Sequence, residues 1–233
     1  MNITAGALAA LNTGFRGDFN IGLTGYKPIW DKVATRVPST RSANTYGWLG
    51  DWPGLREWIG DRQVKSISES AYQVTNKSFE GTVSVKRTAI EDDEFGIYSP
   101  MMESMGQSAS EHPDELVFGL LSRGFTEACY DGQNFFDDEH KVGERTVSNM
   151  QAGAGEAGFL LDTRRPLKPL IFQERKKPEF VAKTDLKDEN VFNKGEYVWG
   201  VDSRGNAGFG FWQMAFGSKA ALTAENYEAA FTA

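Results

Sequence analysis

The chain has 233 residues, of which 40% are hydrophobic and 12% aromatic, and its formal net charge is -7. This size and composition indicate a folded protein with one large domain or two small ones. The negative charge argues against a nucleic-acid reader, which needs a concentrated basic face. The single cysteine, Cys129, excludes an intramolecular disulfide and any cysteine-based zinc site.

The first residues show no basic region followed by a long apolar run, which a signal peptide would need. No apolar stretch approaches the roughly 20 residues that cross a bilayer. The sequence therefore indicates a soluble protein of the cytosol that does not bind membranes.

Residues 3–15 have the spacing of an amphipathic helix, with Thr4 as the N-cap and with Gly14 and Gly17 ending it. Residues 22–42 contain two prolines and few periodic apolar positions. We expect them to form an extended arm with one short helical turn. Such an arm has to pack on its own body or on a neighbour.

Residues 44–60 are rich in tryptophan and are interrupted by glycines and Pro53, which is typical of a loop or the end of a hairpin. Residues 63–71 alternate weakly, and residues 79–85 alternate clearly, as strands do. We expect these two strands to be joined near Asn76–Lys77 as a projecting hairpin, which needs a partner because an isolated hairpin is marginally stable.

Large aromatic side chains on such an excursion, with no catalytic pair beside them, indicate an interface with another protein. The predicted subunit-interface residues are Trp48, Trp52, Trp58 and Phe79.

A helical pattern extends over residues 98–124, and Ser99–Pro100 fits an N-cap followed by the first helical position. Gly106 and Pro113 interrupt the pattern, so it predicts either one kinked helix, which we favour, or two helices in tandem. Thr88 and Glu91 resemble a capping box just before it.

Strand signals return at residues 169–172, 180–182, 197–200 and 208–216, the last of which we expect to be central in a sheet. Trp199 and Trp212 are predicted core residues. The glycine-rich residues 205–210 are expected to form a tight turn that leads into the last strand. The basic residues between 164 and 177 are expected at strand ends or turns, and residues 222–228 start a helix capped by Thr223.

Asp137–His140 is the nearest approach to a ligand cluster, because carboxylates can hold a hard cation. Adjacent residues point in different directions, however, and we interpret the segment as a solvated acidic turn. Cys129 has no basic neighbour in sequence and is interpreted as a packing residue. No nucleophile, phosphate-loop or metalloprotease motif occurs. The sequence thus predicts no catalytic residue, no cofactor-binding residue, no cofactor and no metal site.

Eight motifs, in the same order along the chain, resemble the major head subunit of Mu-like phages and prophages, the Mu-like gpT family. They are residues 40–50, 77–83, 91–98, 113–116, 129–137, 168–175 and 210–215, with 91–93 and 96–98 counted separately. The resemblance covers nearly the whole chain. It implies an α+β protein with the phage capsid fold named for phage Hong Kong 97.

The resemblance implies four segments. Residues 1–43 would be the N-terminal arm, 44–87 the extended hairpin loop, and 88–147 a peripheral domain whose spine helix is 98–124. Residues 148–233 would supply further peripheral and axial strands. Family members continue past this point, and the chain ends at Ala233 inside an expected helix, so we expect the axial domain to be incomplete.

The function implied is that of a structural, non-enzymatic capsid subunit, which assembles with copies of itself into the icosahedral head of a Mu-like phage around its DNA. Pentamers and hexamers, scaffold, protease and portal proteins are the implied partners. Specific nucleic-acid binding is not expected. The virion is the implied location, with assembly in the bacterial cytoplasm. Two alternatives stay open: an encapsulin-like compartment subunit, and a non-viral α+β binding protein or hydrolase that uses the loop Asp137–His140.

Overall fold

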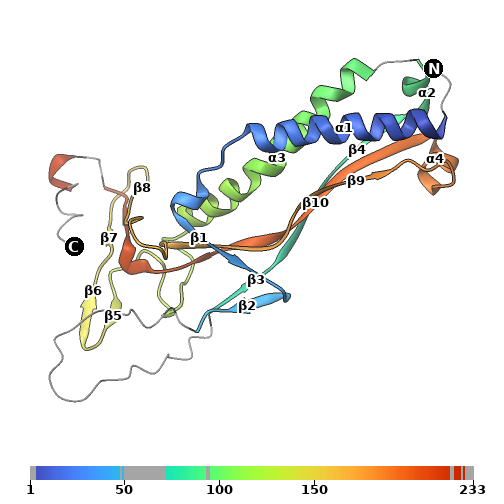
Figure 1. The fold of residues 1–233 in the computed structure, drawn as a ribbon. Helices are drawn as coiled ribbons and strands as arrows, with labels where there is room; N and C mark the ends of the chain where they lie inside the picture. Colours follow the sequence, from blue (N-terminus) through green and yellow to red (C-terminus); the bar gives the residue numbers. More distant parts are fainter. Residues whose placement is uncertain are drawn as a thin grey trace. The chain divides into compact units, whose positions relative to one another are not determined.

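The computed structural model describes residues 4–47, 49, 72–92, 95–220, 223–226 and 228. The chain is of the α+β class (Figure 1) and divides into two compact units. Unit 1 comprises residues 1–28, 77–115 and 174–205, and unit 2 comprises residues 29–76, 116–173 and 206–233. Three long elements, α3, β9 and β10, run from one unit into the other along the chain. No helix among the described residues is long and apolar enough to cross a membrane.

Unit 1 consists of helices and three long strands. Its elements are α1 (Ala5–Gly25), β4 (Lys77–Lys86), α2 (Arg87–Glu91), most of α3 (Phe95–Ser122), the second part of β9 (Leu170–Lys183), α4 (Glu189–Lys194) and the first part of β10 (Glu196–Phe209). Strand β10 lies between β9 and β4 and pairs with β4 in antiparallel register, from Glu196 opposite Lys86 to Gly205 opposite Lys77.

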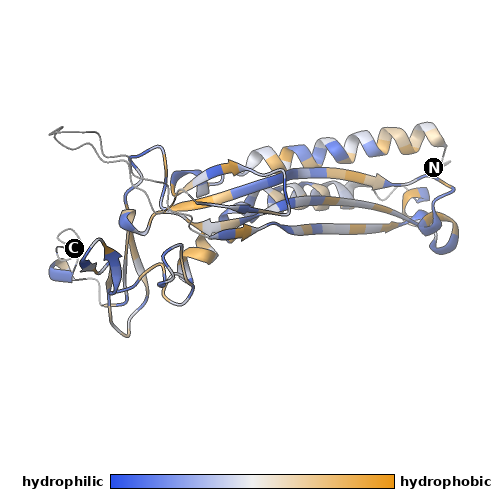
Figure 2. Ribbon diagram, turned by 90° about the horizontal axis from the view of Figure 1, so that it is seen from below, coloured by the Kyte–Doolittle hydropathy of each residue, from blue (hydrophilic) through white to orange (hydrophobic). Residues whose placement is uncertain are grey.

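The core of unit 1 lies between the helices and the sheet. Along α1, hydrophobic and hydrophilic residues alternate (Figure 2), and its buried face consists of Leu8, Phe15, Phe19 and Gly22. The Trp199 ring lies in this core as predicted, meets the Phe15 ring edge-on at 5.0 Å, and donates its indole N–H to Asn12 at 2.8 Å. The other buried members of this cluster are Val85, Ile90, Met102, Phe180, Val191 and Tyr197.

Helix α1 is longer than predicted. Thr4 is its N-cap, since its hydroxyl accepts a hydrogen bond from the Ala7 amide at 3.1 Å. Gly14 and Gly17 do not end it, however, and the helix continues to Gly25. Packing against α3 explains the difference, because burial of an apolar face outweighs the unfavourable helix propensity of single glycines.

Helix α3 is one continuous helix from Phe95 to Ser122, with Pro100 and Pro113 inside it. The predicted start at Ser99 is wrong. The Ser99 hydroxyl donates a hydrogen bond to the carboxylate of Asp18 on α1 instead. A second link joins the Tyr26 hydroxyl, just beyond α1, to the Asp114 carboxylate at 2.8 Å. The predicted capping box at Thr88 is not formed, since α2 begins at Arg87 without a side-chain cap.

Two glycines allow α1 and α3 to touch through their backbones. A Cβ atom on Gly22 would lie 1.8 Å from the Glu103 carbonyl oxygen, and one on Gly106 would lie 2.0 Å from the Phe19 carbonyl oxygen. Neither distance is possible for real atoms. Any side chain at Gly22 or Gly106 therefore has to push the helices apart.

We predict that Gly106→Ala lowers the free energy of unfolding by about 1–3 kcal/mol, the usual cost of overpacking a filled contact. The matched control is Gly14→Ala on the exposed side of α1, where a Cβ would meet nothing within 4 Å. That change should stabilise the protein by about 0.5–1 kcal/mol, because it removes a helical glycine. Urea unfolding of both variants measures the two effects. Equal effects of the same sign would contradict the close contact.

Unit 2 is built from short strands around the ends of β9 and β10. Its remaining elements are η1 (Trp30–Lys32), β1 (Ala34–Pro38), β2 (Ala43–Thr45), β3 (Gln73–Thr75), β5 (His140–Val142), β6 (Arg145–Val147), β7 (Met150–Gln151), β8 (Gly158–Leu161), η2 (Trp212–Met214) and β11 (Ala215–Ser218). Strand β1 pairs with β9, β2 with β3, β5 with β6, and β11 lies between β7 and β8. The short helical turn expected in the arm is η1.

The C-terminal strand predictions need three corrections. Residues 205–210 are not a turn, because they lie in and just after β10. Residues 209–216 do not form one strand either, since η2 separates the end of β10 from β11. Finally, Arg175, Lys176 and Lys177 lie within β9 instead of at a strand end. The Thr223 cap is present, as its hydroxyl accepts a hydrogen bond from the Asn226 amide at 3.2 Å.

The main core of unit 2 contains aromatic side chains from segments that are far apart in the sequence. The Phe135 and Phe209 rings stack at 4.6 Å, and the Trp30 and Phe172 rings pack at 4.5 Å. Trp212 belongs to this core, as predicted, and is 3% exposed. The buried Asn149 amide joins its parts, because its nitrogen donates to the carbonyls of Phe135, Trp212 and Ala215 at 2.8–3.2 Å.

Candidate assembly site

The structure places only part of the predicted interface. Trp48, Trp52 and Trp58 lie outside the described residues. Phe79 lies on β4, is partly exposed, and its ring packs edge-on against the His112 ring of α3 at 4.2 Å. The start of the aromatic run is anchored in unit 2, where Tyr46 is 2% and Leu49 is 0% exposed.

The strand pairing around the predicted hairpin differs from the expectation. No turn forms at Asn76–Lys77, because β3 and β4 follow one another with only Asn76 between them. Strand β4 pairs with β10, and β3 pairs with β2. The joint predicted at Asn76–Lys77 is wrong, because alternation along a strand does not identify its partner, and the first predicted strand, residues 63–71, lies outside the described residues. The two ends of the excursion between β2 and β3 thus meet as a two-stranded base in unit 2.

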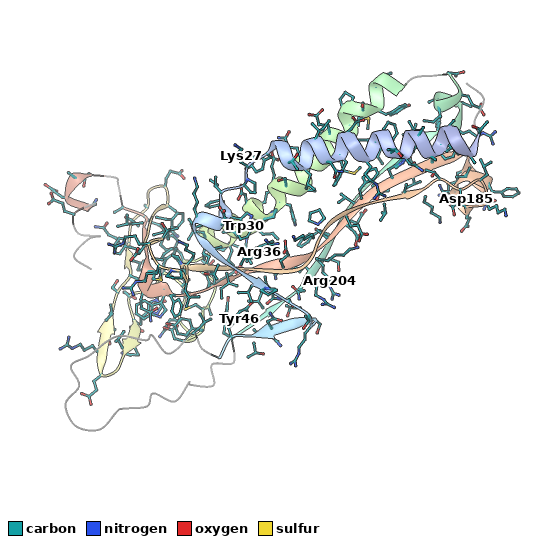
Figure 3. The ribbon with its side chains drawn as sticks, in the orientation of Figure 1. Lys27, Trp30, Arg36, Tyr46, Asp185 and Arg204 are labelled. Carbon is teal, nitrogen blue, oxygen red and sulfur yellow. The ribbon has the colours of Figure 1, made fainter. Side chains whose placement is uncertain are left out.

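Buried amides hold this base. The side chain of Gln173 on β9 is fully buried, and its nitrogen donates to the Val74 carbonyl at 3.1 Å and to Asn76 Oδ1 at 2.8 Å. Its oxygen accepts a hydrogen bond from the hydroxyl of Tyr46, labelled beside β2 in Figure 3, at 2.8 Å. Gln173 therefore touches the outgoing and the returning chain of the excursion at once.

Asn76 extends the network to the arm. Its side-chain nitrogen donates to Ser39 Oγ and to the Arg41 carbonyl, both at 2.8 Å. The Ser39 hydroxyl in turn donates to Asn44 Oδ1 at 2.9 Å. Every one of these polar groups is satisfied within the network, which is what makes buried polar groups tolerable and geometrically specific.

We predict that Gln173→Leu lowers the free energy of unfolding by about 3 kcal/mol or more, because the Tyr46 hydroxyl, the Val74 carbonyl and Asn76 Oδ1 each lose their hydrogen bond to Gln173 in a buried site. Amide hydrogen exchange in β2 and β3 should also accelerate. Lys177→Gln, an exposed change on the same strand, is the control and should have little effect. Unchanged exchange rates in β2 and β3 would contradict the role of Gln173.

Tyr72 adds a second anchor next to β3. Its hydroxyl accepts a hydrogen bond from the Phe209 amide at 2.7 Å, and its carbonyl accepts one from the Tyr46 amide at 2.9 Å. Burial raises the pKa of Tyr72 to about 12. Burial likewise raises the pKa of Tyr46. Both phenols therefore stay neutral in the folded protein well into the alkaline range.

The raised pKa of Tyr72 predicts a loss of stability at high pH. An unfolded tyrosine ionises near pH 10, whereas folded Tyr72 stays neutral to about pH 12. The stabilisation is complete below pH 10 and is lost as the pH rises to about 12, by up to about 3 kcal/mol. Tyr72→Phe should flatten this part of the stability–pH curve, at a cost of about 1–2 kcal/mol at neutral pH for the unpaired Phe209 amide. An equally steep loss in the variant would refute this.

The loop Asp137–His140 is not simply a solvated acidic turn. Asp138 and Glu139 are exposed, but the His140 ring is fully buried and stacks on the Trp212 ring at 3.9 Å. Cys129 is a buried packing residue as predicted, and it also contacts Asp131. Burial raises the pKa of the Cys129 thiol. A catalytic cysteine needs a lowered pKa, so this arrangement does not support a nucleophile for the hydrolase alternative.

Exposed apolar side chains concentrate in unit 1, and the sequence analysis missed them. Of the eight large hydrophobic side chains exposed among the described residues, six belong to unit 1: Ile21, Ile97, Met101, Val181, Leu186 and Phe192. Phe192 on α4 is 81% exposed, whereas its neighbour Val191 is buried. The sequence could have indicated this exposure, because a short helix on a protein surface can bury only one residue of an adjacent Val–Phe pair.

A groove in unit 1 adds to this surface. It has a volume of about 660 Å³ and lies between α3 and the strands β4 and β10. Phe79 and His112 line it together with Met101, which is 43% exposed. Among the described residues, β4 has β10 on one side only, so its outer edge is the edge of the sheet. Apolar side chains, a groove and a strand edge are features of surfaces that bind other proteins.

The chain is similar to proteins whose role is known. The sequence profile of the family described as Mu-like prophage major head subunit gpT matches residues 8–233. The Mu-like prophage FluMu major head subunit of Haemophilus influenzae is 48% identical, over 97% of this chain and 77% of its own length. The major capsid protein of Escherichia phage Mu is 45% identical, over 97% of this chain and 78% of its own length.

Solved structures agree with these relatives. A chain in the procapsid of bacteriophage JBD30 is 51% identical with a TM-score of 0.85, over 97% of this chain and 79% of that one. A chain in the JBD30 capsid is 36% identical with a TM-score of 0.77, over 100% of this chain and 80% of that one. The capsid fold expected from the sequence is therefore confirmed.

Proposed function

The chain belongs to the family of Mu-like prophage major head subunits, and from this membership we propose how its two units serve the shell. It is a major capsid protein that forms the phage head, and it is a structural protein, not an enzyme. The same relatives support the phage head over an encapsulin-like compartment or a hydrolase. Its place is the capsid of the virion.

We propose that the four segments expected from the sequence have the roles of their counterparts in a capsid subunit: residues 1–43 the arm, 44–87 the loop region, 88–147 the peripheral domain with its spine helix, and 148–233 further peripheral and axial strands. The pairing of β4 with β10 supports one refinement. The loop itself is limited to residues 44–76, and its base is the network around Gln173.

The observation that carries the assembly proposal is the excess of exposed apolar side chains in unit 1. A subunit that folds alone and then associates with many copies has to keep apolar side chains exposed in the free state, because burial of this surface drives association. Phe192 is the most exposed of these side chains, and we propose it as an interface residue with Phe79. Trp48, Trp52 and Trp58 remain proposed interface residues on the evidence of the sequence.

We predict that Phe192→Ser impairs assembly without lowering the melting temperature of the isolated subunit. A buried interface aromatic can contribute about 2 kcal/mol or more at each contact, and a shell repeats every contact many times. Sedimentation and electron microscopy of the purified chain over a range of concentrations measure assembly. The matched control is Val142→Ser, which removes an exposed apolar side chain from unit 2. The same assay on Trp58→Ala tests the loop.

Two outcomes would count against these proposals. Assembly of Phe192→Ser at the parental concentration would remove Phe192 from the interface. A parental chain that stays monomeric at every concentration would contradict self-assembly by this chain.

We further propose pentamers and hexamers as the oligomers, and scaffold, protease and portal proteins as partners, with assembly in the host cytoplasm. DNA contact should be weak and unspecific, since the net charge is -7 and Arg164 is paired with Asp162 at 2.9 Å. An electrophoretic shift at physiological salt with a dissociation constant of ~10 nM or tighter would contradict this. Co-purification with tagged scaffold and portal proteins tests the partners.

A further inference from the structure

Three side chains with metal-binding atoms meet in unit 2, and one of them belongs to the loop Asp137–His140. They are Cys129, Asp131 and His140, and one ligand atom from each lies within 4.8 Å of the other two. Cys129 Sγ is 3.1 Å from Asp131 Oδ1, and His140 Nδ1 is 2.7 Å from Asp131 Oδ2. Asp131 therefore stands between a thiol and an imidazole.

The backbone holds this cluster in place. Cys129 and Asp131 lie in a tight turn, in which the Cys129 amide donates to the Gln133 carbonyl at 2.8 Å and Gly132 has a positive φ of 86°. The bridge between Ala128 and Asn134 closes the turn. His140 comes from the first residue of β5. The turn and β5 therefore hold the three ligand side chains in position whether or not an ion is bound.

The burial and fixed orientation of the His140 ring also suit a ligand-binding role. Its ring is fully buried and is fixed by parallel stacking on Trp212 at 3.9 Å and 7°. Its Nε2 atom is buried and has no hydrogen-bond partner among the described residues. Native proteins rarely leave a buried polar atom unpaired. Nδ1 shares its proton with the Asp131 carboxylate, and it offers a lone pair to a cation when the ring carries its proton on Nε2 instead.

We propose that Cys129, Asp131 and His140 bind one transition-metal ion of the zinc type. A thiolate, an imidazole and one carboxylate form a donor set that suits Zn²⁺, whereas Mg²⁺ and Ca²⁺ prefer oxygen donors alone. On binding, the thiol proton passes to solvent and the imidazole proton is relocated from Nδ1 to Nε2, so that a thiolate and a neutral imidazole bond to the metal. A mixed set of this kind needs only one cysteine, so the single cysteine of the chain does not exclude it.

The geometry requires only a small movement. Ligand bonds of about 2.0–2.3 Å in a tetrahedral site place neighbouring donor atoms roughly 3.3–3.7 Å apart. The present separations of 3.1 and 2.7 Å therefore have to widen by about 1 Å or less. Asp131 can supply this movement, because its side chain is 20% exposed. The same exposed side admits the ion and leaves a fourth position to water.

The ion would link the turn at residues 129–131 to β5. This link serves stability, not catalysis, because three protein ligands from two segments close a loop of the chain around one metal. The inference goes beyond the shell function and does not depend on it.

Titration of the full 233-residue chain with Co²⁺ tests the proposal. Cys129 is the only cysteine, so a thiolate-to-cobalt charge-transfer band can arise from no other residue. We expect this band to grow to one equivalent and to disappear when Zn²⁺ is added. Cys129→Ser should lack the band. Asp131→Asn and His140→Gln should weaken binding by more than ~10-fold, the loss caused by removal of even an outer-shell partner.

Asp138→Asn is the matched control, since Asp138 is an exposed carboxylate of the same loop outside the cluster, and it should bind as the parent does. A folded parental chain that gives no charge-transfer band with Co²⁺ would overturn the proposal, and this result does not depend on whether any variant folds. A band of parental strength in both Asp131→Asn and His140→Gln would overturn it as well.

Discussion

Burial of the two fourteen-residue strands β9 and β10 is the constraint on which the rest of the structure depends. Both strands contribute to the core of each unit: Phe180 and Trp199 in unit 1, Phe172 and Phe209 in unit 2. Long strands of this kind cannot cover themselves, so each stretch has to be covered by elements from elsewhere in the chain. The helices α1 and α3 do so in unit 1, and short strands and turns do so in unit 2.

The two units solve the problem of stability in different ways. Unit 1 relies on close apolar packing, to the point where Gly22 and Gly106 let two helix backbones touch. Unit 2 has an aromatic core and adds to it buried amide side chains that are hydrogen-bonded, such as Gln173 and Asn149. Apolar packing tolerates many arrangements of similar volume, whereas a buried amide accepts one geometry. The network at Gln173 therefore fixes one arrangement of the chain at Tyr46, Val74 and Asn76.

A shell subunit has to fold stably by itself and to associate with other copies through defined surfaces. The apolar side chains left outside unit 1, with Phe192 as the most exposed, provide adhesion without weakening the core, since Val191 beside it supplies the buried contact of α4. The edge of β4 and the groove beside α3 offer directional contacts near the same side chains. Surface of this kind would be a liability in a protein that works as a monomer.

Sequence alone determined the α+β class, the family, the structural function and the core positions of Trp199 and Trp212. The class, the family and the function were implied by the resemblance, which is carried by motifs in a fixed order, and the positions of the two tryptophans follow from the apolar strand patterns around them. The cap at Thr4 was equally predictable, since a cap involves only the first turn of a helix.

Only the tertiary structure decided the length of α1, the partner of β4 and the surroundings of His140. Gly14 and Gly17 should end a free helix, but burial against α3 carries it to Gly25. The pairing of β4 with β10 could not be predicted, because alternation along a strand specifies which face is buried and not which strand lies beside it. Cys129, Asp131 and His140 meet through a turn and a stacked ring that no spacing rule describes. Long-range contacts depend on the whole chain at once, so local sequence patterns cannot specify them.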